Sequence, residues 1–339
     1  MTSSPAGFGH LTPERMLDAM EHAGLRPDGR LLQLNSYENR VLQAYLEDGS
    51  AVVAKFYRSG RWSDAQILEE HAFARELVEA EVPVVAPMML EVDGQATTLA
   101  HVLGDRFAVS PRQGGRAPEL EDPEVLRWIG RFLARLHEVG QRHPFEHRVS
   151  WNTAQPAREA RDWLRDHDIL APDVAPQWHD AAERCITAIQ AAFDQQPQLR
   201  SLRLHGDCHP GNLLWTPDRG PHFVDLDDAM QGPAVQDLWM MLSGDPEAAR
   251  RQLDALLDGY ESVREFDWRE LRLIEALRTQ RMIHHSAWLA RRWEDPAFPL
   301  AFPWFGTPNY WSDQVVKLRE QLDAMQIEAE KASGLPSWD

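Results

Sequence analysis

One polar stretch in the second half of the chain constrains the fold most, because short apolar segments enclose it. Residues 204–215 begin and end with apolar side chains and contain Asp207 and Asn212, which four residues separate. A turn at residues 217–220 leads into a second apolar segment that ends at Asp225. Short apolar runs around turn residues are typical of strands that pair as a hairpin. We therefore expect Asp207, Asn212 and Asp225 to serve one site.

These three side chains are suited to phosphoryl transfer. In protein kinases the catalytic loop contains an Asp and, after four residues, an Asn, and a second Asp ends a hairpin. Mg²⁺ prefers oxygen ligands, so Asn212 and Asp225 are the expected metal ligands. Asp207 is expected to take the proton of an acceptor hydroxyl. The candidate catalytic residues are therefore Asp207, as the base, and Asp225, as a ligand of the metal.

The alternative interpretation is a tight structural loop. Asp207 and Asn212 would then only cap backbone amides, and Gly211 would supply a left-handed turn. Other residues of the loop also stand at fixed distances from Asp207: His205 and Gly206 directly precede it, and His209 follows two positions later. Each additional match favours the catalytic interpretation.

Length, charge and cysteine content set the class of protein. A chain of 339 residues exceeds the usual size of a single core, so two lobes are expected. The net charge of −18 argues against a nucleic-acid partner or an anionic membrane, since both require a basic face. Two cysteines suit a reducing compartment, and Met1 to His10 lacks the basic and apolar regions of a signal peptide. We expect a cytoplasmic protein without a membrane-spanning segment.

Short apolar runs between turns predict an antiparallel sheet in the first third of the chain. After a helix that Thr12 is expected to cap, these runs lie within residues 31–57. The loop at residues 35–40 occupies the place of a kinase's glycine-rich phosphate lid, but it contains no glycine. Ser36 in this loop is a candidate contact to ATP, and a plain hairpin tip is the alternative.

A lysine in the middle of an apolar strand pattern needs a partner, because burial of an unpaired ammonium is costly. Lys55 matches the lysine strand of kinases, so the phosphates of ATP are one expected partner. The other is a carboxylate of the next helix, which opens with a capping-box pattern at Ser63 and Gln66. Glu70 is favoured over Glu69, because it shares a helical stripe with apolar residues. A solvated glutamate pair and a partly exposed lysine are the alternative.

The end of the sheet pattern is the expected boundary between the lobes. Strand patterns continue through residues 88–110, and a glycine-containing loop follows. Backbone groups of Val109 and Ser110 are expected to hold adenine at this hinge, with a simple surface loop as the alternative. We expect a small antiparallel N-terminal lobe over residues 1–109 and a mostly helical C-terminal lobe over residues 110–339, an α+β fold.

Helical patterns dominate the rest of the chain. Apolar spacing predicts helices over residues 123–139, 157–167 and 175–193, and Asp237 is expected to open another. The last third is rich in aromatic side chains, which are expected to pack or, alternatively, to form a substrate wall for a cation. They are Trp288, Trp293, Phe298, Phe302, Trp304, Phe305, Tyr310 and Trp311.

Several segments together resemble a known family. They are Leu34–Val41, Lys55–Arg58, Gln66–His71, the loop and hairpin of residues 204–225, Gly232–Trp239 and Arg291–Pro299. The loop and hairpin are similar to those of the aminoglycoside phosphotransferase and choline kinase group of protein-kinase-like enzymes. The whole set more closely resembles the bacterial stress response kinase A family.

This resemblance implies a bilobal protein-kinase-like fold and ATP- and Mg²⁺-dependent phosphorylation of serine or threonine on proteins, in the cytoplasm and under stress. Carried over by position, it implies Asp207 as proton acceptor, Asn212 and Asp225 as Mg²⁺ ligands and Ser36 at ATP. A kinase for a small alcohol, such as choline, homoserine or an aminoglycoside, is one alternative. A nucleotide-binding scaffold without activity is the other, and a monomer is expected in each case.

The sequence also departs from eukaryotic protein kinases. Gly206 replaces the Arg that would receive an activation-loop phosphate, and Leu226–Asp227 follows Asp225 in place of Phe-Gly. Regulation by activation-loop phosphorylation is therefore not expected. Asp227 is an additional candidate for contact with a second metal ion.

Overall fold

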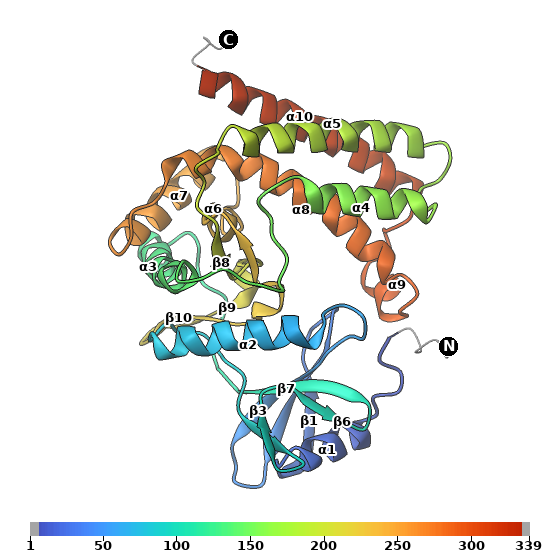
Figure 1. Ribbon diagram of the computed structural model, residues 1–339, viewed down its shortest axis with the longest axis vertical. Helices are drawn as coiled ribbons and strands as arrows, with labels where there is room; N and C mark the ends of the chain where they lie inside the picture. The colour runs from blue at the N-terminus through green and yellow to red at the C-terminus, as the bar shows by residue number, and fades with distance from the viewer. Residues whose placement is uncertain (1–6, 334–339) are drawn as a thin grey trace. The chain divides into compact units, whose positions relative to one another are not determined.

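The structure is a computed structural model that describes residues 7–333 (Figure 1). The chain divides into two compact units, each built from separate segments. The first takes the chain up to Val149 together with Arg203–Met230 and Met240–Phe266, and the second takes Ser150–Leu202, Gln231–Trp239 and the chain from Asp267 onward. The sheet and the catalytic loop thus share one unit. The lobe boundary expected at residue 109 stays a prediction.

A five-stranded antiparallel sheet forms the N-terminal part of the first unit, as the sequence predicts. Its order is β1 (Pro27–Gln33), β2 (Arg40–Leu46), β3 (Ala51–Phe56), β7 (Asp105–Pro111) and β6 (Ala100–Val102). A separate hairpin pairs β4 (Leu90–Val92) with β5 (Gln95–Thr97). Because side chains alternate along β3, Val52, Ala54 and Phe56 are buried in a core that α1 shares, and Lys55 points to the other face.

One capped helix precedes β1 in the sequence, and another follows β3. Helix α1 (Pro13–His22) begins after Thr12, whose hydroxyl accepts from the N–H of Arg15 at 3.3 Å. Helix α2 (Asp64–Glu79) begins with the expected capping box between Ser63 and Gln66. Both sequence signals are confirmed. The capping box of Ser63 and Gln66 fixes where α2 starts, and hence which of its glutamates turns inward.

The polar stretch folds as predicted into a loop and a hairpin. Strand β8 (Leu202–Leu204) precedes the loop, and a 3₁₀ turn (Pro210–Asn212) leads into β9 (Leu213–Thr216), which pairs antiparallel with β10 (Gly220–Phe223). A second 3₁₀ turn (Leu226–Asp228) and β11 (Met230–Gly232) follow. Backbone hydrogen bonds join β10 to the segment of Pro83 and Val85, so the hairpin is anchored within its unit.

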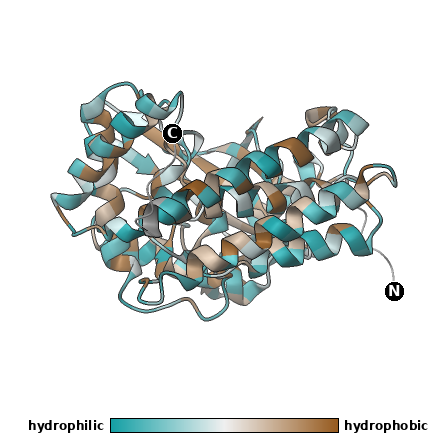
Figure 2. Cartoon of the chain, turned by 90° about the horizontal axis from the view of Figure 1, so that it is seen from above, coloured by the Kyte–Doolittle hydropathy of each residue, from teal (hydrophilic) through white to brown (hydrophobic). Residues whose placement is uncertain are grey.

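Helices make up the remainder of both units. In the first unit, α3 (Pro123–Gly140) packs on α7 (Pro246–Glu261), with glycines at the contact. At Gly130, an added Cβ would lie 1.9 Å from the carbonyl oxygen of Leu256, so the two backbones approach too closely for any side chain there. Each of the two helices buries one set of its side chains and exposes the rest. Figure 2 shows hydrophobic and hydrophilic residues alternating along the helices that face the viewer.

The second unit consists mostly of helices, the longer of which lie side by side in Figure 1. They are α4 (Gln155–Asp166), α5 (Ala175–Asp194), α6 (Val235–Trp239), α8 (Ile274–Arg291), α9 (Ala297–Ala301) and α10 (Pro308–Ser333), with a 3₁₀ segment (Trp268–Leu273) before α8. The expectation that Asp237 opens a helix is wrong, because α6 begins at Val235. The carboxylate of Glu270 accepts from the N–H of Val235 at 2.8 Å, so a distant residue caps this helix.

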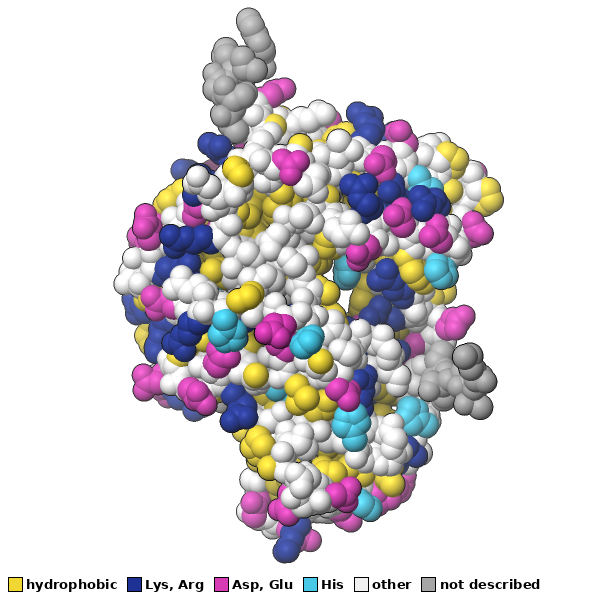
Figure 3. Space-filling view, in the orientation of Figure 1, with side chains coloured by type: hydrophobic (Ala, Val, Ile, Leu, Met, Phe, Trp, Pro, Cys, Tyr) yellow, Lys and Arg dark blue, Asp and Glu magenta, His cyan; other side chains and the backbone are white. Residues whose placement is uncertain are grey.

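The aromatic side chains of the last third mainly pack. Phe298, Phe305 and Trp311 are almost completely buried, whereas Trp304 is half exposed. In the space-filling view of Figure 3, acidic and basic side chains are intermingled over the visible face. Among the described residues, no helix combines the length and the apolar character needed to cross a bilayer.

Candidate active site

The catalytic loop is a tight turn that its own backbone and side chains hold together. The carbonyl of Asp207 accepts from the N–H of His209 at 2.9 Å and from the amide nitrogen of Asn212 at 2.9 Å. Gly206 has φ +82°, and a Cβ there would lie 2.1 Å from the carbonyl oxygen of Asp228. Only glycine fits both the backbone conformation and this close approach.

The carboxylate of Asp207 is mostly buried and oriented by two neighbours. Its Oδ2 accepts from Nδ2 of Asn212 at 3.3 Å and lies 3.6 Å from Nε2 of His209. Because Nδ1 of His209 accepts from the N–H of Gly211 at 3.0 Å, a neutral imidazole carries its proton on Nε2, toward Asp207. The loop therefore presents a fixed carboxylate.

The hairpin brings Asn212 and Asp225 to the same place. The register that pairs Leu213 with Phe223 continues one residue further, where the N–H of Val224 donates to the carbonyl of Asn212 at 3.0 Å. Since the amide nitrogen of Asn212 donates to Asp207, its side-chain oxygen remains as the ligating atom. One amide oxygen and one carboxylate fit a hard cation whose other ligands are phosphate oxygens and water. Within residues 7–333, no group of three or more His, Cys, Asp or Glu is arranged to hold a metal.

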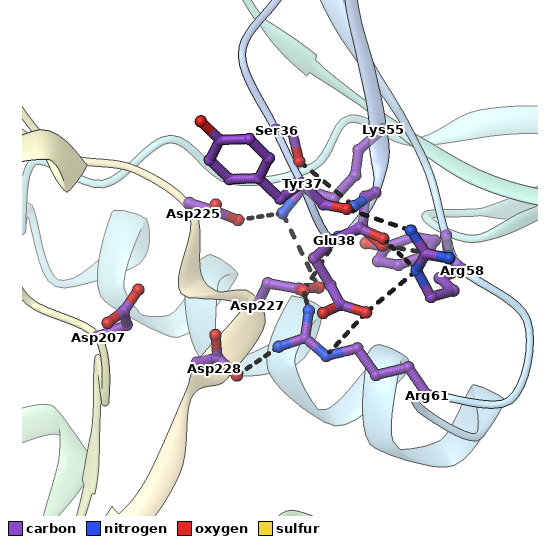
Figure 4. A network of polar contacts seen from close by, with 12 residues as sticks. Ser36, Tyr37, Glu38, Lys55, Arg58, Arg61, Asp207, Asp225, Asp227 and Asp228 are labelled. Carbon is purple, nitrogen blue, oxygen red and sulfur yellow. Dashed lines mark hydrogen bonds and ion pairs between the residues drawn. The ribbon is translucent and has the colours of Figure 1, made fainter. Parts of the chain in front are cut away.

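Asp225 has an unusual backbone and a half-exposed side chain. Its φ and ψ are both 60°, the left-handed region that residues other than glycine seldom occupy. Its Oδ1 lies 2.5 Å from Nζ of Lys55 (Figure 4). Partial removal from water opposes ionisation of this carboxyl, but the ammonium of Lys55 outweighs that effect and holds the pKa of Asp225 below its usual value. The carboxylate is therefore charged at neutral pH.

Lys55 forms ion pairs with the segment at the end of the hairpin. Its ion pairs among the described residues are with Asp225 at 2.5 Å and Asp227 at 4.0 Å. Burial alone would lower the pKa of Lys55, but these carboxylates hold it well above its ordinary value. Glu70 is buried as the helical stripe predicts, and burial raises its pKa to about 7. A contact between Glu70 and Lys55 stays a prediction.

Glu69 has a separate and unexpected role. Its carboxylate accepts from three consecutive backbone N–H groups, those of Glu146 at 2.5 Å, His147 at 3.0 Å and Arg148 at 2.9 Å. The guanidinium of Arg148 then donates to the carbonyls of Asp227 at 2.5 Å and Ala229 at 2.8 Å. Helix α2 is thereby connected to the end of the hairpin through residues that sequence reasoning missed.

The remaining predicted residues lie in the sheet and its first loop. The Ser36 hydroxyl accepts from the N–H of Asn39 at 3.3 Å, in the loop between β1 and β2. Val109 and Ser110 lie inside β7, opposite β3, and the carbonyl of Val109 accepts from the N–H of Met88 at 2.7 Å. Strand β7 ends at Pro111, where the glycine-containing loop of the expected hinge begins. The contacts of these residues with ATP stay predictions.

Comparison with known proteins agrees with this geometry. Residues 30–274 match the model of the phosphotransferase enzyme family. The chain is 44% identical to stress response kinase A of Escherichia coli (strain K12), over 96% of this chain and 97% of the relative. It is also 44% identical to the serine/threonine protein kinase RdoA of Salmonella typhimurium (strain LT2), over 95% of each.

A solved structure extends the likeness to the fold. The amicoumacin kinase hAmiN, in complex with AMP-PNP, Ca²⁺ and Ami, superposes with a TM-score of 0.69 at 17% identity, over 92% of this chain and 93% of that one. The protein-kinase-like fold expected from the sequence is confirmed, and so is the resemblance on which it rested. The chain belongs to the phosphotransferase enzyme family and, within it, to the stress response kinase A family of kinases.

Proposed function

We propose that this kinase transfers the γ-phosphoryl group of ATP to serine and threonine hydroxyls of proteins, with Mg²⁺. One observation carries the proposal: a single loop and hairpin bring an oriented carboxylate at Asp207 beside the oxygen donors of Asn212 and Asp225. A scaffold that only binds nucleotide has no physical need for this complete set. The name of the Salmonella relative supports a protein acceptor.

Asn212 and Asp225 would hold Mg²⁺. The ion supplies charge neutralisation at the phosphates. Lys55 provides a fixed positive charge next to Asp225, and we assign it to the ATP phosphates together with Ser36. Glu70 would be the second partner of Lys55, and backbone groups at Val109 and Ser110 would hold adenine.

Asp207 would act as the general base. Its carboxylate accepts the proton of the acceptor hydroxyl while that oxygen forms a bond to the γ-phosphorus. The bond between the γ-phosphorus and the β,γ-bridging oxygen breaks, and ADP leaves with the electron pair. The Nδ2 donor of Asn212 keeps the carboxylate in place, so the base needs no reorganisation before the reaction.

A kinase for a small alcohol is the second candidate, because its loop chemistry would be the same. The amicoumacin kinase hAmiN, in complex with AMP-PNP, Ca²⁺ and Ami, supports the use of a nucleotide and a divalent cation. We also propose a monomer. We propose the cytoplasm as its location, because both cysteines, Cys185 and Cys208, are buried thiols and a reducing compartment keeps thiols reduced.

The test uses purified protein, γ-labelled ATP and Mg²⁺. One reaction contains the protein alone, a second a generic basic protein, and a third a panel of small alcohols, each beside the Asp207→Ala variant. Label on protein serine or threonine that disappears in the variant is expected. Label only on a small alcohol would replace the proposed acceptor class, and no transfer in any reaction would refute the proposal.

A further inference from the structure

Asp227 is buried although it lies two residues after the proposed metal ligand Asp225. Only 4% of Asp227 is exposed. Its Oδ2 accepts from Nδ2 of Asn39 at 3.0 Å and from Nη1 of Arg61. These two donors come from the loop before β2 and from the segment before α2 (Figure 4 shows Arg61). Protein donors therefore engage Oδ2 of the Asp227 carboxylate.

Asn39 continues the connection into the loop between β1 and β2. Its Oδ1 accepts from the N–H of Arg58 at 3.1 Å, and its own N–H donates to the hydroxyl of Ser36 at 3.3 Å. The Arg58 guanidinium donates to the carbonyls of Tyr37 at 3.2 Å and Glu38 at 2.9 Å. Side chains therefore hold this loop, which has no glycine, in one conformation.

Arg61 provides a second link between the same two segments. Its Nη2 donates to Oδ1 of Asp228 at 2.5 Å, and its Nε lies 3.8 Å from Oε1 of Glu38. The Arg61 side chain is about nine-tenths buried. A buried guanidinium stays where its carboxylate partners are, because removal of one partner leaves an uncompensated charge.

We propose that Asp227 is a positioning residue that fixes the loop of residues 34–39 to the metal hairpin through Asn39 and Arg61, and that it is not a ligand of a second metal. This inference depends on the proposed function in one respect: it takes the loop of residues 34–39 as the lid over the ATP phosphates. A loop held in place before ATP arrives loses less conformational entropy on binding. The loss of Asp227 therefore weakens ATP binding and leaves the Mg²⁺ requirement unchanged.

A reciprocal exchange of side chains tests the contact. Asp227→Asn removes the negative charge from the pair, and Asn39→Asp places two carboxylates against each other. The double variant restores one carboxylate and one amide with the hydrogen bond reversed. All three changes are isosteric, and Asp48→Asn in the exposed β2–β3 turn is the matched control.

The first readout is hydrogen exchange of residues 34–39 in the protein without nucleotide or metal. Exchange is expected to be at least tenfold faster in Asn39→Asp, and the double variant is expected to recover most of the protection. The Asp48→Asn control should match the wild type. Unchanged exchange in both single variants, or a double variant no better than Asn39→Asp, would overturn the proposal.

The second readout separates positioning from metal ligation. KM for ATP is expected to rise about tenfold in Asn39→Asp with a smaller change in kcat, and to return toward the wild-type value in the double variant. The Mg²⁺ concentration for half-maximal rate should stay unchanged in Asp227→Asn. If excess Mg²⁺ restores Asp227→Asn, the residue is a metal ligand and the proposal is wrong. Because exchange is measured without substrates, it remains decisive even if no phosphoryl transfer is found.

Discussion

Replacement of Gly206 by alanine should destabilise the protein and disturb the site in a calculable way. The residue has φ +82°, where an L-amino acid costs about 1–2 kcal/mol. The new Cβ would also lie 2.1 Å from the carbonyl oxygen of Asp228, and this backbone atom cannot rotate away. Overpacking of this kind costs about 1–3 kcal/mol. We expect Gly206→Ala to lower the free energy of unfolding by about 2–5 kcal/mol in total.

Urea unfolding of the variant beside Gly49→Ala measures this loss. Gly49 has a similar φ of +84°, but nothing lies within 4 Å of the point that a Cβ would occupy there, so only the backbone cost of about 1–2 kcal/mol applies. Since Gly206 precedes Asp207, its variant should also lose kcat, whereas Gly49→Ala should retain it. Equal losses of stability in the two variants would refute the reasoning from the close approach to Asp228.

Three further perturbations test the surroundings of the site. Glu70 has a folded-state pKa of about 7 against an ordinary 4.5, so its stabilising contribution is complete below pH 4.5 and disappears as the pH rises through 7. In urea unfolding, the stability of the wild type relative to Glu70→Gln should fall by about 3 kcal/mol over this range, and a constant difference would contradict the pKa shift. Lys55→Met leaves Asp225 without its ammonium and should lower kcat/KM about 100-fold in the transfer assay, an effect that a merely structural lysine would not produce. Glu69→Ala removes the acceptor of three backbone N–H groups and should accelerate hydrogen exchange at residues 146–148. Unchanged exchange would show that these bonds do not order the segment.

Local sequence signals predicted the fold well. The apolar runs and turns of the first third indicated the antiparallel sheet, and the capping residues Ser63 and Gln66 marked the start of α2. The helical stripe also identified Glu70 as the buried member of its pair. Each of these features depends on residues within a few positions of one another, where spacing alone carries the information.

The partners of the site residues could not be predicted in the same way. Arg61 and Asp227 are 166 positions apart, and no periodic pattern connects them. Spacing showed that Glu69 faces away from the apolar stripe, but nothing in it indicated the backbone segment of residues 146–148 that Glu69 binds. Likewise, the cap of α6 comes from Glu270, which lies 35 residues after the helix starts. Such contacts depend on how the elements pack.

The most direct test of the central claim compares the wild type with Asp207→Asn, an isosteric change that removes only the basic carboxylate. The rate of γ-phosphoryl transfer and the affinity for ATP are measured on the same preparations in the presence of Mg²⁺. A positioned general base contributes about 10²- to 10⁴-fold, so kcat should fall by at least about 100-fold while ATP affinity stays unchanged. A variant that retains the wild-type kcat would contradict the assignment of Asp207 as the base.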